Sequence, residues 1–360
     1  MRAYITVITK SYVAYARVLM DCLRAVDPAV TQYVFLADNV DGYFNPADES
    51  FQVVLPEDFV EPSDLNQMAF QYTAFELSTA LKAYAHRYML RKTCCDDWMY
   101  FDSDIYPISS CKALLERPNN GDATIFLTPH ILKACPPDLI WLETLFLHYG
   151  IYNGGWLGIR RSADAEVFIE WYVLRLRTHS FSEYRFSFTD QLWLNLAPLY
   201  LHGFSVVDDP GANIGYWNLH ERNMTETPDG SNEVDGTTVS FVHFSGWDAT
   251  NPMTVTRYYP QIESSPAWRK FAAAYSKDLL SAGLLTTRTW PYSWACYENG
   301  QVIGAQDRRK FADQSYDGSW PATLDPFKCP DRFSEPTLKG LKKQLKGRLA
   351  GMRKRFTSGQ

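Results

Sequence analysis

The sequence predicts an α/β fold with a mixed, mostly parallel sheet flanked by helices, and three observations support this prediction. A segment rich in β-branched residues (3–9) precedes helically spaced apolar residues (12–26) and a second apolar segment that ends at an Asp (32–39). Strand, helix and strand in so short a stretch form a βαβ unit, which favours parallel strands. Hydrophobic residues make up 46% of the 360-residue chain, enough for a sizeable core.

The later elements continue this alternation along the chain. Helical spacing of apolar residues recurs over 73–90 and 163–177, where Ser162 is a fitting N-cap. Apolar segments predict strands at 98–102, 122–127 and 237–246, and 189–200 predicts a shorter helix. The glycines of "YNGGWLGI" (152–159) predict a loop that feeds a strand. A less regular extension, which we expect to be partly helical, begins at about residue 263.

Charge and cysteine content indicate a cytoplasmic protein. The net charge is −6, but eight Lys or Arg and no acidic residue lie between Pro336 and Gln360, so the body is more acidic than the whole. The seven cysteines are scattered and form no CxxC motif, which favours reduced thiols. The N-terminal apolar run is too short for a signal peptide, and no apolar run is long enough for a membrane span.

The segment "WMYFDSDIYP" (98–107) carries chemistry at the end of a predicted buried strand. Ligands of open parallel sheets bind beyond the carboxyl ends of the strands, where Asp102 and Asp104 stand. One residue separates the two aspartates, so an extended chain would point both side chains the same way. Adjacent carboxylates repel unless a cation lies between them, and hard oxygen ligands suit Mg²⁺ or Mn²⁺, which in turn hold phosphates. A solvated turn is the alternative.

Five motifs in order give the chain a resemblance to the retaining glycosyltransferases of family 8, which include glycogenin and bacterial lipopolysaccharide α-galactosyltransferases. The motifs are "TVITKSY", "YFDSD", "YNGGWLGI", "DQLWLN" and "HFSG". The sequence is most similar to a bacterial branch found among cell-surface polysaccharide genes, which has "ELSTALKAYAHRYML" (76–90) and "NIGYWNLHER" (213–222). The resemblance covers roughly residues 3 to 250 and implies the GT-A fold.

The resemblance implies a metal site and a nucleotide site. Asp102 and Asp104 would bind Mn²⁺ (or Mg²⁺), and His243 of "HFSG" would be the third protein ligand. Positions that would contact the base, ribose or diphosphate of a nucleotide sugar, with UDP as the expected nucleotide, are Val7, Thr9, Tyr12, Lys82 and Asp102. As single residues, these side chains would more often belong to the core, to a cap or to a solvated face.

The resemblance also assigns residues to the donor sugar. Asn153, Gly154 and Gly155 belong to the loop that would meet the sugar, where glycine permits close backbone approach. Asp190 and Gln191 match the pair nearest the anomeric carbon and are the candidates for a nucleophile or for stabilising the sugar's developing charge. Each assignment competes with an ordinary loop or a solvent-facing helix position.

Two segments leave alternatives open. The family commonly has a diphosphate-binding Lys three residues after the Gly of "HFSG", but this chain has Ala249 there. Either Lys82 or Arg222 would supply the cation instead, or the donor would be held differently. In "NIGYWNLHER", Tyr216 and Trp217 either stack on sugars or belong to the core. The polar residues of the same segment that could bind sugar hydroxyls are Asn213, Asn218, His220 and Arg222.

The expected function is metal-dependent transfer of a sugar, with retention, to a glycan or lipid-linked acceptor in cell-surface polysaccharide or lipopolysaccharide synthesis. The expected domains are a nucleotide-sugar-binding and catalytic domain (1–262), the extension (263–335) and a basic tail (336–360). Alternatives are a catalytically inactive sugar-nucleotide-binding or scaffolding module and a nucleotidyltransferase, although the latter usually has a Gly-rich phosphate loop that "TVITKSY" lacks. Nucleic acid is not among the expected partners.

The tail predicts a basic amphipathic helix from 336 to 356. Six apolar residues recur at spacings of three or four and would form one stripe: Leu338, Leu341, Leu345, Leu349, Met352 and Phe356. A cationic helix of this kind can lie on an anionic membrane surface, which would place the protein on the inner face of the cytoplasmic membrane. A helix packed on the body or on a partner, or a frayed tail, is the alternative.

Overall fold

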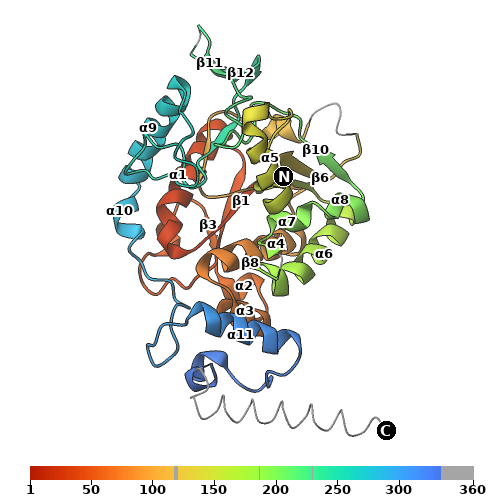
Figure 1. Ribbon diagram of the computed structural model, residues 1–360, viewed down its shortest axis with the longest axis vertical. Helices are drawn as coiled ribbons and strands as arrows, with labels where there is room; N and C mark the ends of the chain where they lie inside the picture. The colour runs from red at the N-terminus through yellow and green to blue at the C-terminus, as the bar shows by residue number, and fades with distance from the viewer. Residues whose placement is uncertain (117–120, 186, 229, 334–360) are drawn as a thin grey trace. The chain divides into compact units, whose positions relative to one another are not determined.

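The computed structural model describes residues 1–116, 121–185, 187–228 and 230–333 (Figure 1). The chain divides into two compact units, 1–295 and 296–360. The first unit contains every residue assigned above to the metal, the nucleotide or the sugar. The predicted helix at 336–356 lies outside the described residues and stays a prediction.

A seven-stranded sheet in the order β10–β6–β7–β4–β1–β2–β3 forms the centre of the first unit (Figure 1). β7 runs antiparallel to both of its neighbours, and the other adjacent pairs are parallel. The predicted mixed, mostly parallel sheet is therefore confirmed. Its strands are β1 (Arg2–Ile8), β2 (Thr31–Leu36), β3 (Gln52–Val54), β4 (Asp97–Phe101), β6 (Ile125–Pro129), β7 (Tyr152–Arg160) and β10 (Phe204–Val206).

Helices cover both faces of this sheet, as the nearly complete burial of β1 and β4 requires. α4 packs against α6, whereas α1 packs against α9 and α10. Thr73 and Glu76 form a capping box at the start of α4, and Ser162 caps α6 as predicted. The helices of this unit are α1 (Val13–Val26), α2 (Pro56–Phe59), α3 (Pro62–Gln71), α4 (Ala74–Lys92), α5 (Ile140–Tyr149), α6 (Ala163–His179), α7 (Gln191–Leu194), α8 (Ala197–Tyr200), α9 (Pro266–Ser281) and α10 (Leu284–Thr287).

Short antiparallel sheets lie outside the central sheet. β5 (Ile105–Pro107) pairs with β14 (Phe241–His243), which brings the "YFDSD" and "HFSG" segments together across the fold. The remaining small sheets are formed by β8 (Ser182–Tyr184) with β9 (Ser187–Phe188), and by β11 (Met224–Glu226), β12 (Asn232–Val234) and β13 (Thr237–Thr238).

Three local predictions differ from the structure. The glycines at 154 and 155 lie within β7 and not in a loop before it. The helix predicted at 189–200 is two short helices, α7 and α8, because Pro198 occupies the first turn of α8 and cannot continue a preceding helix. The late strand predicted at 237–246 is divided into β13 and β14.

The packed first unit continues beyond residue 262, where we predicted the catalytic domain to end. Trp268, Phe271 and Tyr275 of α9 are buried in one core cluster with Val242 and Phe244. The boundary of the catalytic domain itself stays a prediction. All seven cysteines are free, in agreement with the expected reduced thiols.

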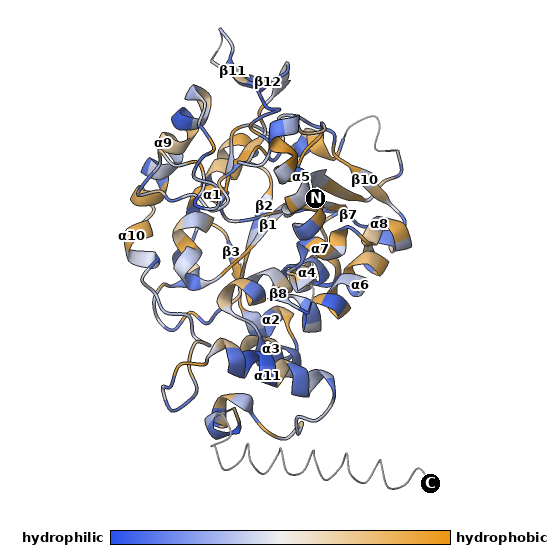
Figure 2. Ribbon diagram, viewed as in Figure 1, coloured by the Kyte–Doolittle hydropathy of each residue, from blue (hydrophilic) through white to orange (hydrophobic). Residues whose placement is uncertain are grey.

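The second unit contains α11 (Ala305–Tyr316), which is mostly hydrophilic (Figure 2). Its apolar side is small: Phe311 packs edge-on against Trp320, and Trp320 stacks on Phe333. Among the described residues, no helix combines the length and the apolar character needed to cross a bilayer.

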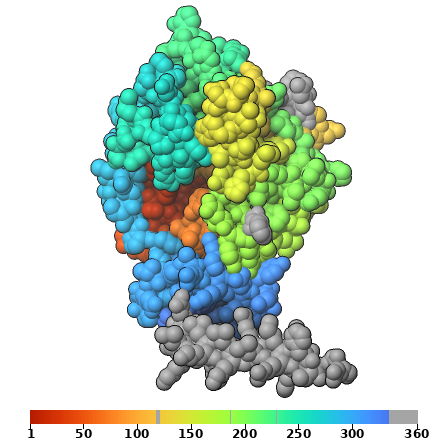
Figure 3. Space-filling view, viewed as in Figure 1, coloured from red at the N-terminus to blue at the C-terminus, as the bar shows by residue number. Residues whose placement is uncertain are grey.

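One face of the first unit is hollowed, and N-terminal residues lie recessed there between later segments (Figure 3). A cavity of about 450 Å³ is lined by the start of α1, by the loop after β14, and by Leu284 and Arg288 at the two ends of α10. Its volume falls in the usual range for small-molecule sites.

Candidate functional site

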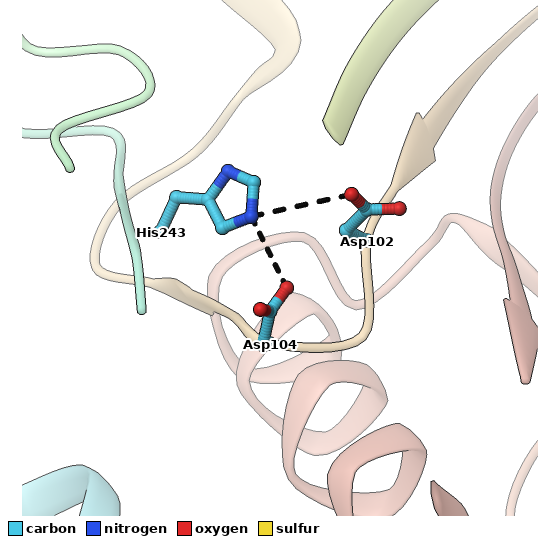
Figure 4. Close-up of side chains that lie close together, drawn as sticks. All are labelled: Asp102, Asp104 and His243. Atoms are coloured by element: carbon cyan, nitrogen blue, oxygen red, sulfur yellow. Dashed lines mark ion pairs between the residues drawn. The ribbon is translucent and has the colours of Figure 1, made fainter. Parts of the chain in front are cut away.

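Asp102, Asp104 and His243 converge beyond the carboxyl end of β4 (Figure 4). The Nε2 atom of His243 lies 3.1 Å from Oδ1 of Asp104 and 4.0 Å from Oδ2 of Asp102. One ligand atom from each of the three side chains lies within 4.8 Å of the others. Two carboxylates and an imidazole form a donor set that suits a divalent cation such as Mn²⁺.

A tight turn, and not an extended chain, presents the two aspartates. The amide of Ile105 donates to the carbonyl of Asp102 (3.1 Å), which closes a turn around Ser103, so the predicted extended geometry was wrong. Asp104 reaches His243 because β5 and β14 pair, and the amide of Phe244 donates to the carbonyl of Asp104 (2.9 Å). The convergence therefore depends on a strand pair that joins distant segments.

Asn213 orients the imidazole of His243 from behind. Its Oδ1 lies 3.1 Å from Nδ1 of His243, and its Nδ2 donates to Oγ1 of Thr128 (2.9 Å). Asn213 thereby holds the ring with Nε2 facing the two carboxylates, and a neutral imidazole that donates from Nδ1 would offer the lone pair of Nε2 to a cation. A ligating histidine usually has such a partner on its other nitrogen, so these residues fit a metal site.

Lys82 on α4 is buried between Asp102 and Asp190. Its Nζ lies 2.9 Å from Oδ1 of Asp102, 3.1 Å from Oδ2 of Asp190 and 3.1 Å from the carbonyl of Gly154. Burial alone would lower the pKa of Lys82, but the two carboxylates raise it to about 12. Burial raises the pKa of Asp190, because desolvation disfavours the charged carboxylate; Lys82 opposes this shift and the negative charge of Asp102 adds to it.

The predicted sugar residues Asp190 and Gln191 lie against the glycines of β7. Tyr172 donates its hydroxyl to Oδ2 of Asp190 (3.2 Å), and Oε1 of Gln191 accepts from the amide of Gly154 (2.9 Å). Nε2 of Gln191 donates to the carbonyl of Tyr149 (3.0 Å). A Cβ at Gly154 would come within 2.7 Å of Oδ2 of Asp190, so only glycine permits this close approach.

Gly155 makes the same kind of space for His243. A Cβ at Gly155 would lie 2.3 Å from Cε1 of His243, and the carbonyl of Gly155 accepts from the amide of Asp102 (2.7 Å). Oδ1 of Asn153 accepts from the amide of Gly155 (2.9 Å). The two glycines therefore make room for protein side chains, Asp190 at Gly154 and His243 at Gly155. The close approach of a ligand to these glycines stays a prediction.

His130 is a buried residue that the sequence patterns did not single out. Its Nε2 lies 3.1 Å from Nδ2 of Asn153, and its ring stacks on Phe146. Burial lowers the pKa of His130 to about 4, which keeps the ring neutral near pH 7. The carbonyl of His130 accepts from Nδ2 of Asn218 (3.0 Å). The sequence signal for His130 is the segment "TPH" (128–130), in which two polar residues follow an apolar run.

Tyr100 and Tyr172 were also missed. The hydroxyl of Tyr100 donates to Oδ1 of Asp102 (2.6 Å), and the ammonium of Lys82 lies 4.9 Å from the centroid of the Tyr100 ring. Tyr100 precedes Asp102 by two residues, a spacing that predicts both side chains on one side of a strand. This spacing was a sequence signal for Tyr100. Tyr172 had no such signal, because it lies mid-helix in α6.

The three predicted nucleotide residues near the N-terminus have different environments. Val7 is buried within β1, and Thr9 is mostly buried, with Oγ1 2.9 Å from Oγ of Ser11. Tyr12 is 47% exposed, stacks on Tyr15 at 5.0 Å between ring centroids, and lines the cavity. Of these three side chains, that of Tyr12 is open to a ligand.

The segment 213–222 contributes mainly structure. Trp217 is buried and packs edge-on against His243, with ring centroids 5.1 Å apart, so the core alternative holds for it. Arg222 is buried, pairs with Glu221 (3.3 Å) and donates to the carbonyl of Asp209 (3.4 Å). The guanidinium of Arg222 is therefore already bound by protein partners.

No family model matches the sequence, and no curated protein does. Several solved structures resemble the fold at low identity. A galactosyltransferase, LgtC, in complex with donor and acceptor sugar analogues shares 16% identity over 82% of this chain and 99% of its own, with a TM-score of 0.47. The glycosyltransferase GlyE of Streptococcus pneumoniae TIGR4 shares 14% identity over 82% of this chain and 66% of its own, with a TM-score of 0.44. Because these values are low, we argue the activity from the residues of the chain itself.

Proposed function

We propose that this chain is a metal-dependent retaining glycosyltransferase that uses a nucleotide-diphospho-sugar. The observation that carries the proposal is the convergence of Asp102, Asp104 and His243 beyond the sheet, with Lys82 joining Asp102 to Asp190. The order of the family 8 motifs supports the same function, since all five belong to the first unit. UDP-linked donors and Mn²⁺ are the leading candidates.

The cation would be held by Asp102, Asp104 and His243, and when bound it would supply charge stabilisation for a departing diphosphate. Lys82 holds the carboxylates of Asp102 and Asp190 in fixed positions, so neither has to reorganise during the reaction. Tyr100 and Tyr172 each donate a hydroxyl to one of these carboxylates. The site is thus preorganised by donors from three different elements.

Asp190 and the neighbouring amides are proposed to face the sugar. Asp190 carries a buried carboxylate, which can stabilise positive charge on the anomeric carbon or act as a nucleophile. Gln191 and Asn153 have their side-chain oxygens bound to the amides of Gly154 and Gly155, so they position this part of β7. Both same-face attack and a covalent intermediate would give the retained configuration.

The test is ligand binding followed by product analysis. Thermal unfolding is measured with a panel of nucleotide sugars, each with and without Mn²⁺; a donor at 100 times its Kd stabilises the folded state by about 2.7 kcal/mol. We expect one nucleotide sugar to raise Tm in a Mn²⁺-dependent way and to be hydrolysed slowly in the absence of acceptor. Stabilisation without hydrolysis or transfer would favour an inactive binding module instead.

The configuration of the product tests the retaining assignment separately. Proton NMR of the product formed from an α-linked donor should show an α-linkage. A β-linkage would contradict the proposed resemblance to family 8 while leaving the metal site intact.

We further propose that the acceptor is a glycan or glycolipid at the inner face of the cytoplasmic membrane, reached through the tail at 336–356. The eight basic residues of 336–360 support this, since each Lys or Arg near an anionic surface contributes about 1 kcal/mol. Truncation after residue 335 should reduce co-sedimentation with anionic vesicles at low salt while donor hydrolysis is unchanged. Equal sedimentation of both forms would contradict the membrane role.

A further inference from the structure

We infer that Arg257 and Arg288, which face one cavity beside the metal cluster, bind the phosphate groups of the ligand. This inference rests on the proposed function, in which a diphosphate is the leaving group. It also answers the question raised by Ala249, which stands where related sequences have a cation. The two arginines are exposed and lie far apart in the sequence, so the sequence alone did not suggest them.

The cavity has aromatic and cationic walls. Its lining includes Tyr12, Tyr15, Gly246, Asp248, Arg257 and Arg288. Among the described residues, neither arginine forms an ion pair, whereas Lys82 and Arg222 do. Asp248 is the acidic residue of the lining, and its Oδ1 is already bound by the amide and hydroxyl of Thr250 (2.9 and 2.8 Å). Nη2 of Arg257 donates to the hydroxyl of Tyr258 (3.3 Å), but neither guanidinium is neutralised by a carboxylate of the described residues, so both remain available to an anion.

Arg257 is fixed to the loop that follows His243. Its amide donates to the carbonyl of Gly246 (2.9 Å), three residues after the histidine. Gly246 has a φ of 67°, and a Cβ there would lie 2.3 Å from the ring of Tyr258, so glycine lets this strand-end loop pack closely. The Arg257 guanidinium lies 5.1 Å from the centroid of the same Tyr258 ring. The backbone and the ring together hold Arg257 at the cavity.

Arg288 approaches the cavity from a different element. It directly follows α10, and its amide donates to the carbonyl of Leu284, which also lines the cavity (3.0 Å). Because planar guanidinium groups bind phosphate oxygens in pairs, two of them on different walls suit a ligand with more than one phosphate.

Tyr15 links the cavity to the metal cluster. Its ring lines the cavity and packs edge-on against Tyr275, with ring centroids 6.3 Å apart. The hydroxyl of Tyr275 donates to the carbonyl of Ser103 (3.4 Å), the residue between Asp102 and Asp104. One anionic ligand could therefore meet both a cation at the aspartates and the two arginines.

The other candidate cations are committed elsewhere. Lys82 is buried with two carboxylates and a carbonyl, and Arg222 is buried with Glu221. Ala249 is itself buried, and its carbonyl accepts from Oγ of Ser276 (2.6 Å), so this backbone position belongs to the core and not to the ligand. The structure therefore points away from the two residues that the sequence suggested.

The inference is tested by calorimetric titration with inorganic pyrophosphate, uridine diphosphate, guanosine diphosphate and uridine, with and without Mn²⁺. Arg257→Ala and Arg288→Ala should each weaken binding of pyrophosphate and of the preferred nucleoside diphosphate by about 10- to 100-fold, as expected for a lost hydrogen bond to a charged group. Binding of the nucleoside should not change. Arg257→Lys should recover part of the affinity.

The matched control is Arg269→Ala, because Arg269 donates to the carbonyl of Ser264 (2.8 Å) and does not line the cavity. It should bind all probes as the unmodified protein does, and thermal unfolding confirms that every variant is folded. Wild-type affinity of both Arg257→Ala and Arg288→Ala would overturn the inference while leaving the proposed function in place. Binding of pyrophosphate, but of no nucleoside diphosphate, would support the phosphate site and overturn the proposed donor. Binding of neither would overturn both.

Discussion

Two buried lysines, each held by two aspartates, allow a direct comparison within the first unit. Nζ of Lys10 lies 3.1 Å from Oδ1 of Asp38, 2.9 Å from Oδ2 of Asp41 and 2.7 Å from Oγ of Ser293. Nζ of Lys82 has the same kind of surroundings: Asp102, Asp190 and the carbonyl of Gly154. The partners of the two ammonium groups therefore do not distinguish the clusters.

The clusters differ in what their carboxylates face. Oδ1 of Asp38 also accepts from the amides of Asn39 and Ser293 (both 3.0 Å), so its surroundings are protein donors. Oδ2 of Asp102 instead faces the imidazole of His243 across 4.0 Å, beside Asp104. A buried lysine with two aspartates is therefore not itself the mark of a site. The mark is a carboxylate oxygen left for a ligand next to further ligand atoms.

Replacing either lysine should have the largest effect on stability, and the turnover of the two variants should distinguish the two clusters. Lys10→Met and Lys82→Met each leave one buried carboxylate, that of Asp38 or Asp190, without a counter-charge, which should cost about 3–5 kcal/mol in the free energy of unfolding. Only Lys82→Met should also lower the turnover of its folded fraction, because Asp102 and Asp190 lose their shared position. Denaturant unfolding and activity per folded molecule measure both. Equal loss of turnover in the two variants would remove the distinction.

Asp104→Asn should leave the fold intact but reduce transfer by roughly 10²- to 10³-fold, because a preorganised charge at the site is lost. Asp41→Asn is the matched change in the Lys10 cluster, where Asp41 has a 43% exposed side chain, and should leave turnover near that of the unmodified protein. Steady-state kinetics over a Mn²⁺ titration give the comparison. A folded Asp104→Asn variant with full activity and an unchanged Mn²⁺ titration would place the metal site elsewhere.

Gly155→Ala should reduce Mn²⁺ affinity by about 10- to 100-fold, as loss of the correct orientation of a metal ligand typically does. The added methyl would displace the His243 ring, because the two would otherwise be 2.3 Å apart. Gly158→Ala in the same strand is the control, because its Cβ would meet Leu115 at 2.4 Å, in the core. Titration calorimetry should show weakened Mn²⁺ binding in the first variant only, and the same loss in both would indicate a general effect of straining β7.

The last prediction concerns pH and the buried histidine beside the Lys82 cluster. Burial lowers the pKa of His86 to about 3, with Lys82 adding to the shift, while the unfolded chain has a pKa near 6.5. The unfolded state therefore takes up a proton first as the pH falls, and stability present above pH 6.5 should be lost by about 1.4 kcal/mol per pH unit between about 6.5 and 3.

His86→Gln should flatten this slope, because glutamine keeps an acceptor for the indole N–H of Trp98 (2.9 Å in the native pair) without a titrating ring. His202→Gln, at an exposed histidine, is the control and should leave the slope as it is. Denaturant unfolding at a series of pH values provides the measurement. An unchanged slope in His86→Gln would show that His86 does not remain neutral in the folded state.

The sequence by itself determined the central strands, the main helices and the position of the aspartate pair. These features depend on local patterns: β-branched runs for β1 and β2, helical spacing for α1, α4 and α6, and an Asp pair directly after an apolar strand. It also selected His243 and Asp190, through motif order, and the structure brings both into one connected group with Asp102. The glycines at 154 and 155 predicted a loop, but they lie within β7 and make room for side chains that are distant in the sequence.

Tertiary structure alone decided which polar residues act together. The pairing of β5 with β14 sets His243 beside Asp104, and Asn213 holds the ring from a segment 30 residues away. The role proposed for Arg257 and Arg288 likewise depends on α10 and the loop after β14 lining the same cavity. A sequence states the charge of each residue, but the neighbours that distinguish the Lys82 cluster from the Lys10 cluster come together only when distant segments pack.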